Sequence, residues 1–307
     1  MGKKKHVRVA VVQAASVLFN LEKSVEKSIE LIKKAAALGA ELILFPEAFL
    51  PGYPRGMDFG AVVGSRTLDG KKAWQIYFDN ALELPGEFTD KIGKTVKECR
   101  CHVVIGVIEK DARSMGTLYC TMLYFGPDGK IMGKHRKLKP TGSERIIWGE
   151  GQGDDLDVYH TSIGRIGGLI CWENYMPLAR MALYQQGIGI YLAPTADARD
   201  EWQATVRHIA LEGRCFVLSC NQFVTKDMYP ENIPGVEKLA DEPNIMSKGG
   251  SVIISPFGEA LAGPLFDKED ILYADLDLDW ITRGKMDFDV SGHYHRPDVF
   301  KFDYKPK

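Results

Sequence analysis

Short apolar runs typical of buried β-strands alternate with amphipathic segments of helical period along most of the 307-residue chain. The first run, residues 8–14, is followed by a segment whose apolar side chains recur every three or four positions from Leu21 to Ala36. Asn20 can cap the start of this helix and Gly39 its end. Apolar strands separated by helices are typical of sheets that helices cover, so the pattern predicts an α/β protein.

One hairpin interrupts this alternation. Residues 117–125 and 130–135 flank a Pro-Asp-Gly turn and predict two antiparallel strands, so we expect mixed rather than purely parallel sheets. The other predicted strands cover residues 41–45, 102–109, 163–170, 188–192, 215–222, 250–255 and 271–275, and the other helices cover 89–100, 177–186 and 201–213. Residues 226–248 contain three prolines and predict a long surface loop. No repeat or linker divides the chain, so we expect a single domain over residues 1–307.

Composition excludes several classes of function. The 39 basic and 41 acidic side chains give a net charge of −2, and nucleic-acid binders usually carry a basic surface. No stretch free of charged residues reaches the ~20 residues that a membrane helix needs. The basic start of the chain is followed by an interrupted apolar run without the cleavage junction of a secretory signal. We therefore expect a soluble, cytoplasmic protein without a nucleic-acid or membrane partner.

The six cysteines do not form a recognisable metal or disulfide pattern. They are Cys99, Cys101, Cys120, Cys171, Cys215 and Cys220. No pair has the C-x-x-C spacing of zinc sites. The even count could mean three disulfides, but six cysteines in a chain of this length are ordinary for a cytosolic protein, so we expect free thiols. The H-Y-H segment at residues 293–295 is a lone pair of histidines, and we expect no metal site.

Three reactive side chains follow predicted strands directly: Glu47, Lys137 and Cys171. In α/β sheets, reactive groups gather where the carboxyl ends of strands meet, so a carboxylate, an ammonium and a thiol at such ends form a candidate nucleophilic site. Each also has a structural alternative. The cysteine could be a small core residue, the glutamate a capping or surface carboxylate, and the lysine part of a solvated basic run. Spacing alone leaves these alternatives open.

The segments around these residues resemble the nitrilase superfamily of carbon–nitrogen hydrolases. They read ELILFPEAFLPGYP, KHRKLKPTGSERIIWGEG and GGLICWENYMPLAR. The resemblance covers nearly the whole chain, and the segments CWEN, APTAD and HIALEG are similar to the true nitrilase branch, plant and bacterial, rather than to the amidase branches. It implies a four-layer α-β-β-α sandwich with mixed sheets.

The resemblance also implies a Glu–Lys–Cys triad at Glu47, Lys137 and Cys171, with a second glutamate at Glu144. A nitrile carbon is a weak electrophile, so its attack requires a thiolate, for which Glu47 would be the general base. Lys137 would stabilise the charge that develops on the nitrile nitrogen and donate a proton. Water activated by Glu47 or Glu144 would then release ammonia and hydrolyse the thioester. This scheme requires no metal or organic cofactor.

Other residues near the triad have expected roles of lower specificity. Tyr53 and Trp172 are the candidates for substrate binding, with plain packing as the alternative. Glu173 and Asn174 are expected to support the site structurally, whereas the sequence does not show which way His135 points. The five cysteines other than Cys171 have no base or cation predicted beside them, and we expect them to be inert packing.

The leading hypothesis is therefore a nitrilase that converts an organic nitrile to a carboxylic acid and ammonia. The alternatives are a hydratase-type enzyme that stops at the amide, an amidase of the same fold, and a non-catalytic interaction homologue. Retention of all three polar triad residues argues against the last. By resemblance we expect a small-molecule nitrile substrate and a homo-oligomer built from dimers. Nitrilases often have a longer tail after the RPDVF segment that takes part in filaments, so no filament is expected.

Overall fold

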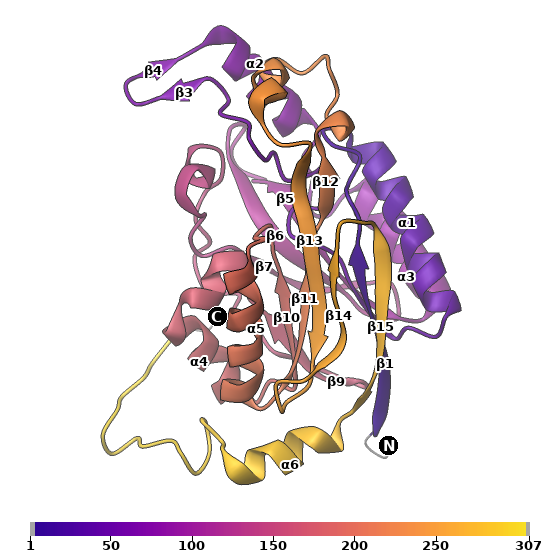
Figure 1. Cartoon of the computed structure of the whole chain (residues 1–307), viewed down its shortest axis with the longest axis vertical. Coiled ribbons are helices and arrows are strands. Elements are labelled where there is room, and N and C mark those ends of the chain that lie inside the picture. The colour runs from indigo at the N-terminus through magenta and orange to yellow at the C-terminus, as the bar shows by residue number, and fades with distance from the viewer. Residues whose placement is uncertain (1–3, 305–307) are drawn as a thin grey trace.

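Two β-sheets stacked face to face, with helices on both outer sides, form the body of the computed structural model, which describes residues 4–304 (Figure 1). The first sheet has the order β15-β1-β2-β5-β6-β7. Its strands are β15 (Asp270–Asp277), β1 (His6–Gln13), β2 (Leu42–Leu44), β5 (His102–Lys110), β6 (Leu118–Phe125) and β7 (Ile131–Arg136). The helices α1 (Leu21–Ala37) and α3 (Glu87–Cys99) cover its outer face.

The second sheet has the order β12-β13-β11-β10-β9-β8, with β14 paired to β13. Its strands are β12 (Phe223–Thr225), β13 (Ile245–Ile254), β11 (Phe216–Cys220), β10 (Ile190–Pro194), β9 (Gly164–Gly168), β8 (Tyr159–Thr161) and β14 (Ala260–Phe266). The helices α4 (Pro177–Gln185) and α5 (Asp200–Gly213) cover its outer face. The predicted four-layer α-β-β-α sandwich with mixed sheets is confirmed.

Strand β1 shows why the predicted strands are apolar on both faces. Val9 and Val11 belong to the core between the two sheets, whereas Ala10 and Val12 belong to the core under α1 and α3. Because successive side chains of a strand point to opposite faces, the central residues of a strand inside this sandwich are apolar on both faces. Asn20 caps α1 as predicted, since its side chain accepts a hydrogen bond from the backbone N–H of Lys23 at 3.0 Å.

Strand directions bring two of the predicted strand ends to one edge of the first sheet. β2 is parallel to β5, and β5, β6 and β7 are successively antiparallel. Two reversals make β7 parallel to β2, so both strands end at the same edge. In the second sheet β9, β10 and β11 are parallel and end together. The carboxyl ends of both sheets supply the polar residues described below.

Several elements differ from the sequence-based prediction. The segment 226–248 is not simply a surface loop, because it contains the 3₁₀ turns η3 (Lys226–Met228) and η4 (Val236–Asp241), buries Leu239, and enters β13 at Ile245. Strand β14 was not predicted, nor were α2 (Leu68–Asp79), α6 (Asp279–Asp287) and the short hairpin of β3 (Ala61–Val62) and β4 (Ser65–Arg66).

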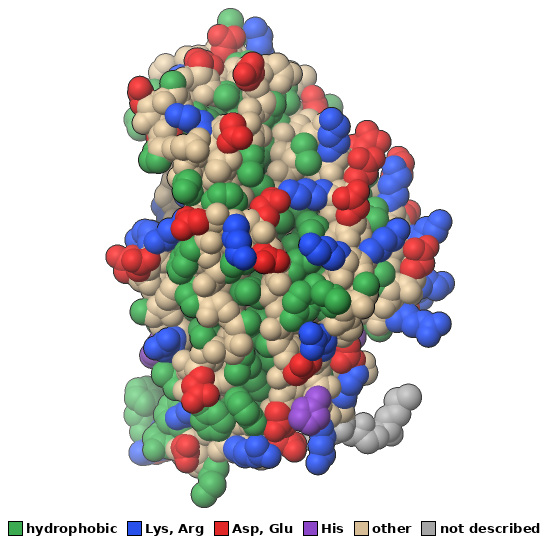
Figure 2. All heavy atoms as spheres, turned by 45° about the vertical axis from the view of Figure 1, so that its right-hand side comes forward, with side chains coloured by type: hydrophobic (Ala, Val, Ile, Leu, Met, Phe, Trp, Pro, Cys, Tyr) green, Lys and Arg blue, Asp and Glu red, His purple; other side chains and the backbone are tan. Residues whose placement is uncertain are grey.

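The surface has a mixed charge. Over the face seen in Figure 2, Lys and Arg side chains are interspersed with Asp and Glu, as expected from a net charge of −2. Between residues 4 and 304, no helix combines the length and the apolar character that crossing a bilayer requires.

Candidate active site

The structure brings together the four residues that the sequence proposed for catalysis. Glu47 lies three residues after β2, and Lys137 directly follows β7 at the same edge of the first sheet. Cys171 follows β9 of the second sheet and begins the 3₁₀ turn η2 (Cys171–Tyr175), while Glu144 lies in η1 (Gly142–Ile146). All four side chains are buried. The base and the cation thus come from one sheet and the thiol from the other.

The ammonium of Lys137 bridges the two glutamates. Its Nζ donates to Oε1 of Glu47 at 2.6 Å and to Oε2 of Glu144 at 2.7 Å. Burial alone would lower the pKa of Lys137, but the negative charge of Glu47, above all, raises it well above its usual value. The lysine therefore stays protonated and presents a fixed positive charge inside the site.

Glu47 has the properties of a proton acceptor. Burial raises its pKa above the usual value, although the Lys137 ammonium opposes this shift. Its Oε2 atom is buried and has no hydrogen-bond partner among the described residues. The nearby Cys171 thiol lowers the pKa of the carboxyl group, but by less than burial raises it. This oxygen is therefore available to take a proton from the thiol.

Cys171 holds its thiol in a sharp reversal of the chain. Its backbone φ of 51° lies in the left-handed region that non-glycine residues seldom adopt, at the point where β9 gives way to η2. The hydroxyl of Thr195, which follows β10, donates to Sγ at 3.2 Å. Burial, followed by the negative charge of Glu47, raises the pKa of Cys171 to about 12. The resting group is therefore the thiol, and the thiolate must form by proton transfer within the site.

Glu144 is fixed from several sides. Its Oε2 atom accepts from the backbone N–H of Thr141 at 2.6 Å, which completes a capping box at the start of η1. Its Oε1 atom accepts from the phenol of Tyr53 at 2.6 Å. Burial and the negative charge of Glu144 raise the pKa of Tyr53, so the phenol remains a donor. Tyr53 therefore holds the second glutamate in addition to lining the cavity.

A buried carboxylate links the segments that carry Lys137 and Cys171. Glu173 accepts from the backbone N–H of Ile170 at 2.7 Å and from that of Leu138 at 2.5 Å. Ile170 precedes the nucleophile and Leu138 follows the lysine, so one side chain sets the separation of the two segments. This geometry agrees with the supporting role expected for Glu173.

His135 also contacts Glu173, so its side chain points toward the link between the two segments, a direction that the sequence did not show. Its Nε2 atom lies 3.0 Å from Oε2 of Glu173, and its Nδ1 atom lies 3.0 Å from Oδ1 of Asp155. Burial alone would lower the pKa of His135, but the charges of Glu173 and Asp155 raise it to about 10. A protonated imidazole thus donates from its two ring nitrogens to Glu173 and to Asp155.

The substitution Glu173→Gln is expected to lower kcat about 10- to 100-fold. An amide has one acceptor oxygen where the carboxylate serves two backbone N–H donors, so one donor is left unsatisfied at a cost of about 1–3 kcal/mol in the free energy of unfolding. Steady-state kinetics and urea denaturation measure both effects. Glu150→Gln, at an exposed glutamate paired with Lys139, is the matched control. A Glu173→Gln protein with the wild-type kcat would contradict this positioning role.

Cys120 corrects one sequence-based expectation. Its buried thiol lies 3.6 Å from Oε1 of Glu47, and its carbonyl accepts from the backbone N–H of Lys137 at 2.8 Å. The prediction that it has no base or cation beside it is therefore wrong. The predicted hairpin could have indicated this contact, because Thr121 pairs with Arg136 and the next residues, Cys120 and Lys137, share a backbone hydrogen bond. All six cysteines are free thiols, as predicted.

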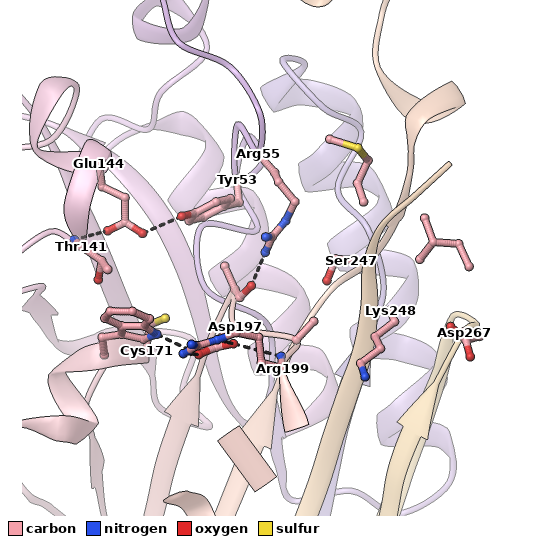
Figure 3. A pocket seen from close by; sticks show the side chains of 15 residues that line it. Tyr53, Arg55, Thr141, Glu144, Cys171, Asp197, Arg199, Ser247, Lys248 and Asp267 are labelled. Carbon is pink, nitrogen blue, oxygen red and sulfur yellow. Dashed lines mark hydrogen bonds and ion pairs between the residues drawn. The ribbon is translucent and has the colours of Figure 1, made fainter. Parts of the chain in front are cut away.

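A cavity of about 590 Å³ opens beside Cys171, and Figure 3 shows the side chains around it. Tyr53 and Trp172, the two candidates for substrate binding, both line it. Trp172 lies at the rim and is 41% exposed, with its indole N–H donating to Asp197 at 2.8 Å. A second cavity of about 420 Å³ shares Tyr53, Arg55 and Glu144 with the first and extends toward Trp148.

The histidines of the H-Y-H segment lie after α6, remote in sequence from the residues that line these cavities. His293 is exposed and His295 is half-buried. Within residues 4–304, no group of three or more His, Cys, Asp or Glu side chains is placed to hold a metal ion.

Comparison with known sequences places this geometry in context. The sequence pattern of the carbon–nitrogen hydrolase family matches residues 8–285. The chain is 52% identical over 303 residues to the aliphatic nitrilase of Sinorhizobium fredii (strain HH103), covering 98% of this chain and 96% of that protein. It is 48% identical over 303 residues to the bifunctional nitrilase/nitrile hydratase NIT4A of Lupinus angustifolius, covering 97% of this chain and 86% of that protein.

Solved structures with the same fold are more distant in sequence. The C. elegans NitFhit protein superposes with a TM-score of 0.76 at 19% identity, covering 99% of this chain and 68% of that chain. A carbon–nitrogen hydrolase from Helicobacter pylori G27 superposes with a TM-score of 0.73 at 21% identity, covering 97% of this chain and 98% of that chain. These likenesses concern the fold.

Proposed function

The chain belongs to the carbon–nitrogen hydrolase family, in its nitrilase branch, and on that premise we propose that it hydrolyses organic nitriles to carboxylic acids and ammonia. The observation that carries this proposal is the bridge of the Lys137 ammonium between Glu47 and Glu144, beside the Cys171 thiol and next to a cavity. A base, a fixed cation and a nucleophile are the groups that addition to a nitrile carbon requires.

The first step forms a covalent thioimidate. Sγ of Cys171 attacks the nitrile carbon as its proton passes to Glu47, whose raised pKa suits it to receive that proton. The π electrons of the nitrile move onto nitrogen, where the ammonium of Lys137 stabilises the negative charge and supplies a proton. Thr195, which donates to Sγ, holds the sulfur in position for the attack.

Two molecules of water complete the reaction. The first, activated by Glu47 or Glu144, adds to the thioimidate carbon, and cleavage of the C–N bond releases ammonia and leaves a thioester. The second adds to the thioester carbonyl, and cleavage of the C–S bond releases the carboxylic acid and restores the thiol. The buried carboxylates and Lys137 exchange the protons of these steps without a change in the total charge of the site.

A second product is the amide. It forms when the tetrahedral intermediate after the first addition of water breaks its C–S bond instead of its C–N bond. The bifunctional nitrilase/nitrile hydratase of Lupinus angustifolius carries both activities in its name and is 48% identical to this chain, which favours a minor amide product here.

The proposal is tested with the purified full chain and a panel of aliphatic, aromatic and arylaliphatic nitriles, together with the corresponding amides. We expect equal amounts of ammonia and carboxylic acid from at least one nitrile, measured by an ammonia assay and mass spectrometry, with amide as the minor product. Faster turnover of the amides than of the nitriles would favour amidase activity. Absence of acid and ammonia from every nitrile would contradict the proposal.

We further propose that the protein is a cytoplasmic homo-oligomer built from dimers. Free thiols at all six cysteines support a reducing compartment. Exposed apolar side chains support an interface between copies of the chain, because large apolar patches commonly mark contacts. They lie before and within α4 and near the end of the described chain: Tyr175, Met176, Leu178, Val299 and Phe300. Light scattering of the purified protein tests this, and a monomer mass would overturn it.

A further inference from the structure

Arg55 is a half-buried cation that lines both cavities. Its guanidinium donates to the carbonyl of Ala196 and lies 5.4 Å from the centre of the Tyr53 ring. Within residues 4–304 it has no carboxylate partner at ion-pair distance, and the one hydrogen bond leaves most of its five N–H donors unused. An arginine with unused N–H donors can bind an anionic group.

The other cations around the first cavity are already paired. Arg199 forms an ion pair with Asp197 at 2.6 Å, and Lys248 forms one with Asp200 at 2.8 Å. The acidic Glu144 is likewise bound by Lys137. Arg55 therefore differs from these two neighbours in forming no ion pair with a carboxylate of the described protein.

The guanidinium and the nucleophile line the same cavity. Sγ of Cys171 accepts from Thr195, and the guanidinium of Arg55 donates to Ala196, the next residue. Consecutive Cα atoms are about 3.8 Å apart, so both groups are anchored to neighbouring points of one wall. Figure 3 shows Arg55 and Cys171 on the same cavity, with Arg55 pointing inward. A substrate bound in this cavity therefore has a nucleophile and a cation on its walls.

We propose that the preferred substrates are short nitriles that carry a carboxylate at the far end. The carboxylate binds the guanidinium of Arg55, whose planar fork matches its two oxygens, while the nitrile carbon lies at Cys171. This inference rests on the proposed nitrile hydrolysis and adds a substrate class to it. The charge on Arg55 thereby becomes the determinant of specificity, whereas the groups around Lys137 perform the chemistry.

The test compares 4-cyanobutanoate with its uncharged isostere 5-methylhexanenitrile. We expect the wild-type protein to have the higher kcat/KM for the anion. Arg55→Gln should lower kcat/KM for the anion about 10- to 100-fold, mainly through KM, the range expected for a charge-assisted hydrogen bond. The neutral substrate should change by less than about threefold, because it has no carboxylate to lose and the glutamine amide can still donate to the Ala196 carbonyl. Arg55→Lys, which keeps the charge but not the fork, should restore part of the loss.

Arg66→Gln is the matched control. Arg66 also donates to backbone carbonyls, at Val62 and Ser65, but it is exposed and lines neither cavity. The substitution Arg66→Gln removes the same charge and should leave kcat/KM for both substrates unchanged.

Two results overturn the inference. Equal losses for both substrates in Arg55→Gln would show that Arg55 merely supports the Ala196 segment, and no wild-type preference for the anion would exclude the carboxylate site. Both leave nitrile hydrolysis standing. Failure of the wild-type protein to hydrolyse either substrate or any nitrile of the panel would instead overturn the proposed function.

Discussion

Replacing Cys171 by alanine is expected to abolish nitrile hydrolysis, with a fall in kcat of at least about 10⁴-fold, while the fold remains intact. The substitution removes the only protein atom that forms a bond to the substrate carbon in the proposed reaction. It takes away one buried sulfur and one hydrogen bond from Thr195, which is a small change for the core. An ammonia assay and a circular dichroism spectrum measure the two parts of this expectation.

Cys101→Ala is the control for this substitution. Burial raises the pKa of the Cys101 thiol to about 12, the same value as for Cys171, but Cys101 lies in the core under α1 and α3. We therefore expect unchanged kcat in the control, because the surroundings of Cys171 and not the acidity of its thiol produce the activity. Residual turnover above about one per cent of wild type in Cys171→Ala would refute the covalent mechanism, since nucleophile removal normally costs far more.

The second large effect is expected from Lys137→Met. It leaves the buried carboxylates of Glu47 and Glu144 without their shared cation, so kcat should fall by about 10²–10³-fold or more through the lost stabilisation of the nitrile nitrogen. Stability should fall too. Removing one partner of a buried ion pair costs about 3–5 kcal/mol in the free energy of unfolding, because it leaves an uncompensated charge in the interior.

The stability deficit of Lys137→Met should depend on pH in a defined direction. Burial raises the pKa of Glu47, and loss of the opposing Lys137 charge raises it further. A carboxyl group whose pKa is higher in the folded than in the unfolded state destabilises the protein above its folded pKa, and this penalty disappears as pH falls toward the unfolded value of 4.5. Urea denaturation at pH 8 and pH 5 should therefore show the larger deficit at pH 8.

Lys139→Met provides the comparison, since Lys139 is half-exposed and pairs only with Glu150 among the described ion pairs. It should leave stability and kcat nearly unchanged at both pH values. Coincident unfolding curves for wild type and Lys137→Met at pH 8 would show that the bridge does not stabilise the fold.

Local patterns determined which parts of the fold could be predicted. Strands such as β1 and β5 have central residues that are apolar on both faces because they lie between two layers, and α1 carries its own cap at Asn20. Strand β14 was not predicted, because a proline such as Pro264 argues against a strand. The structure tolerates this proline because β14 pairs only with β13 in its sheet, and prolines in sheets are confined to such edge positions. Helix α2 buries only Gly70, Ala73 and Tyr77, too narrow a face for a clear helical period.

The candidate site was predictable in its members and not in its contacts. Glu47, Lys137 and Cys171 stand out because strand ends and a family resemblance mark them. The link through Glu173 and His135 depends on how the second sheet docks on the first, and so does the position of Arg55 against Ala196. Such contacts join residues far apart in sequence, and no local pattern encodes them.

The burial of Cys171 has a consequence beyond the reaction itself. Peroxides and alkylating agents in the surrounding solution react with thiolates, and a thiol whose pKa is raised to about 12 supplies almost none at neutral pH. We therefore expect the folded protein to react more slowly with such agents than the unfolded chain does, while the proposed proton transfer to Glu47 forms the thiolate during the reaction. An unfolded chain, in which the cysteine recovers its ordinary acidity, loses this protection together with its base.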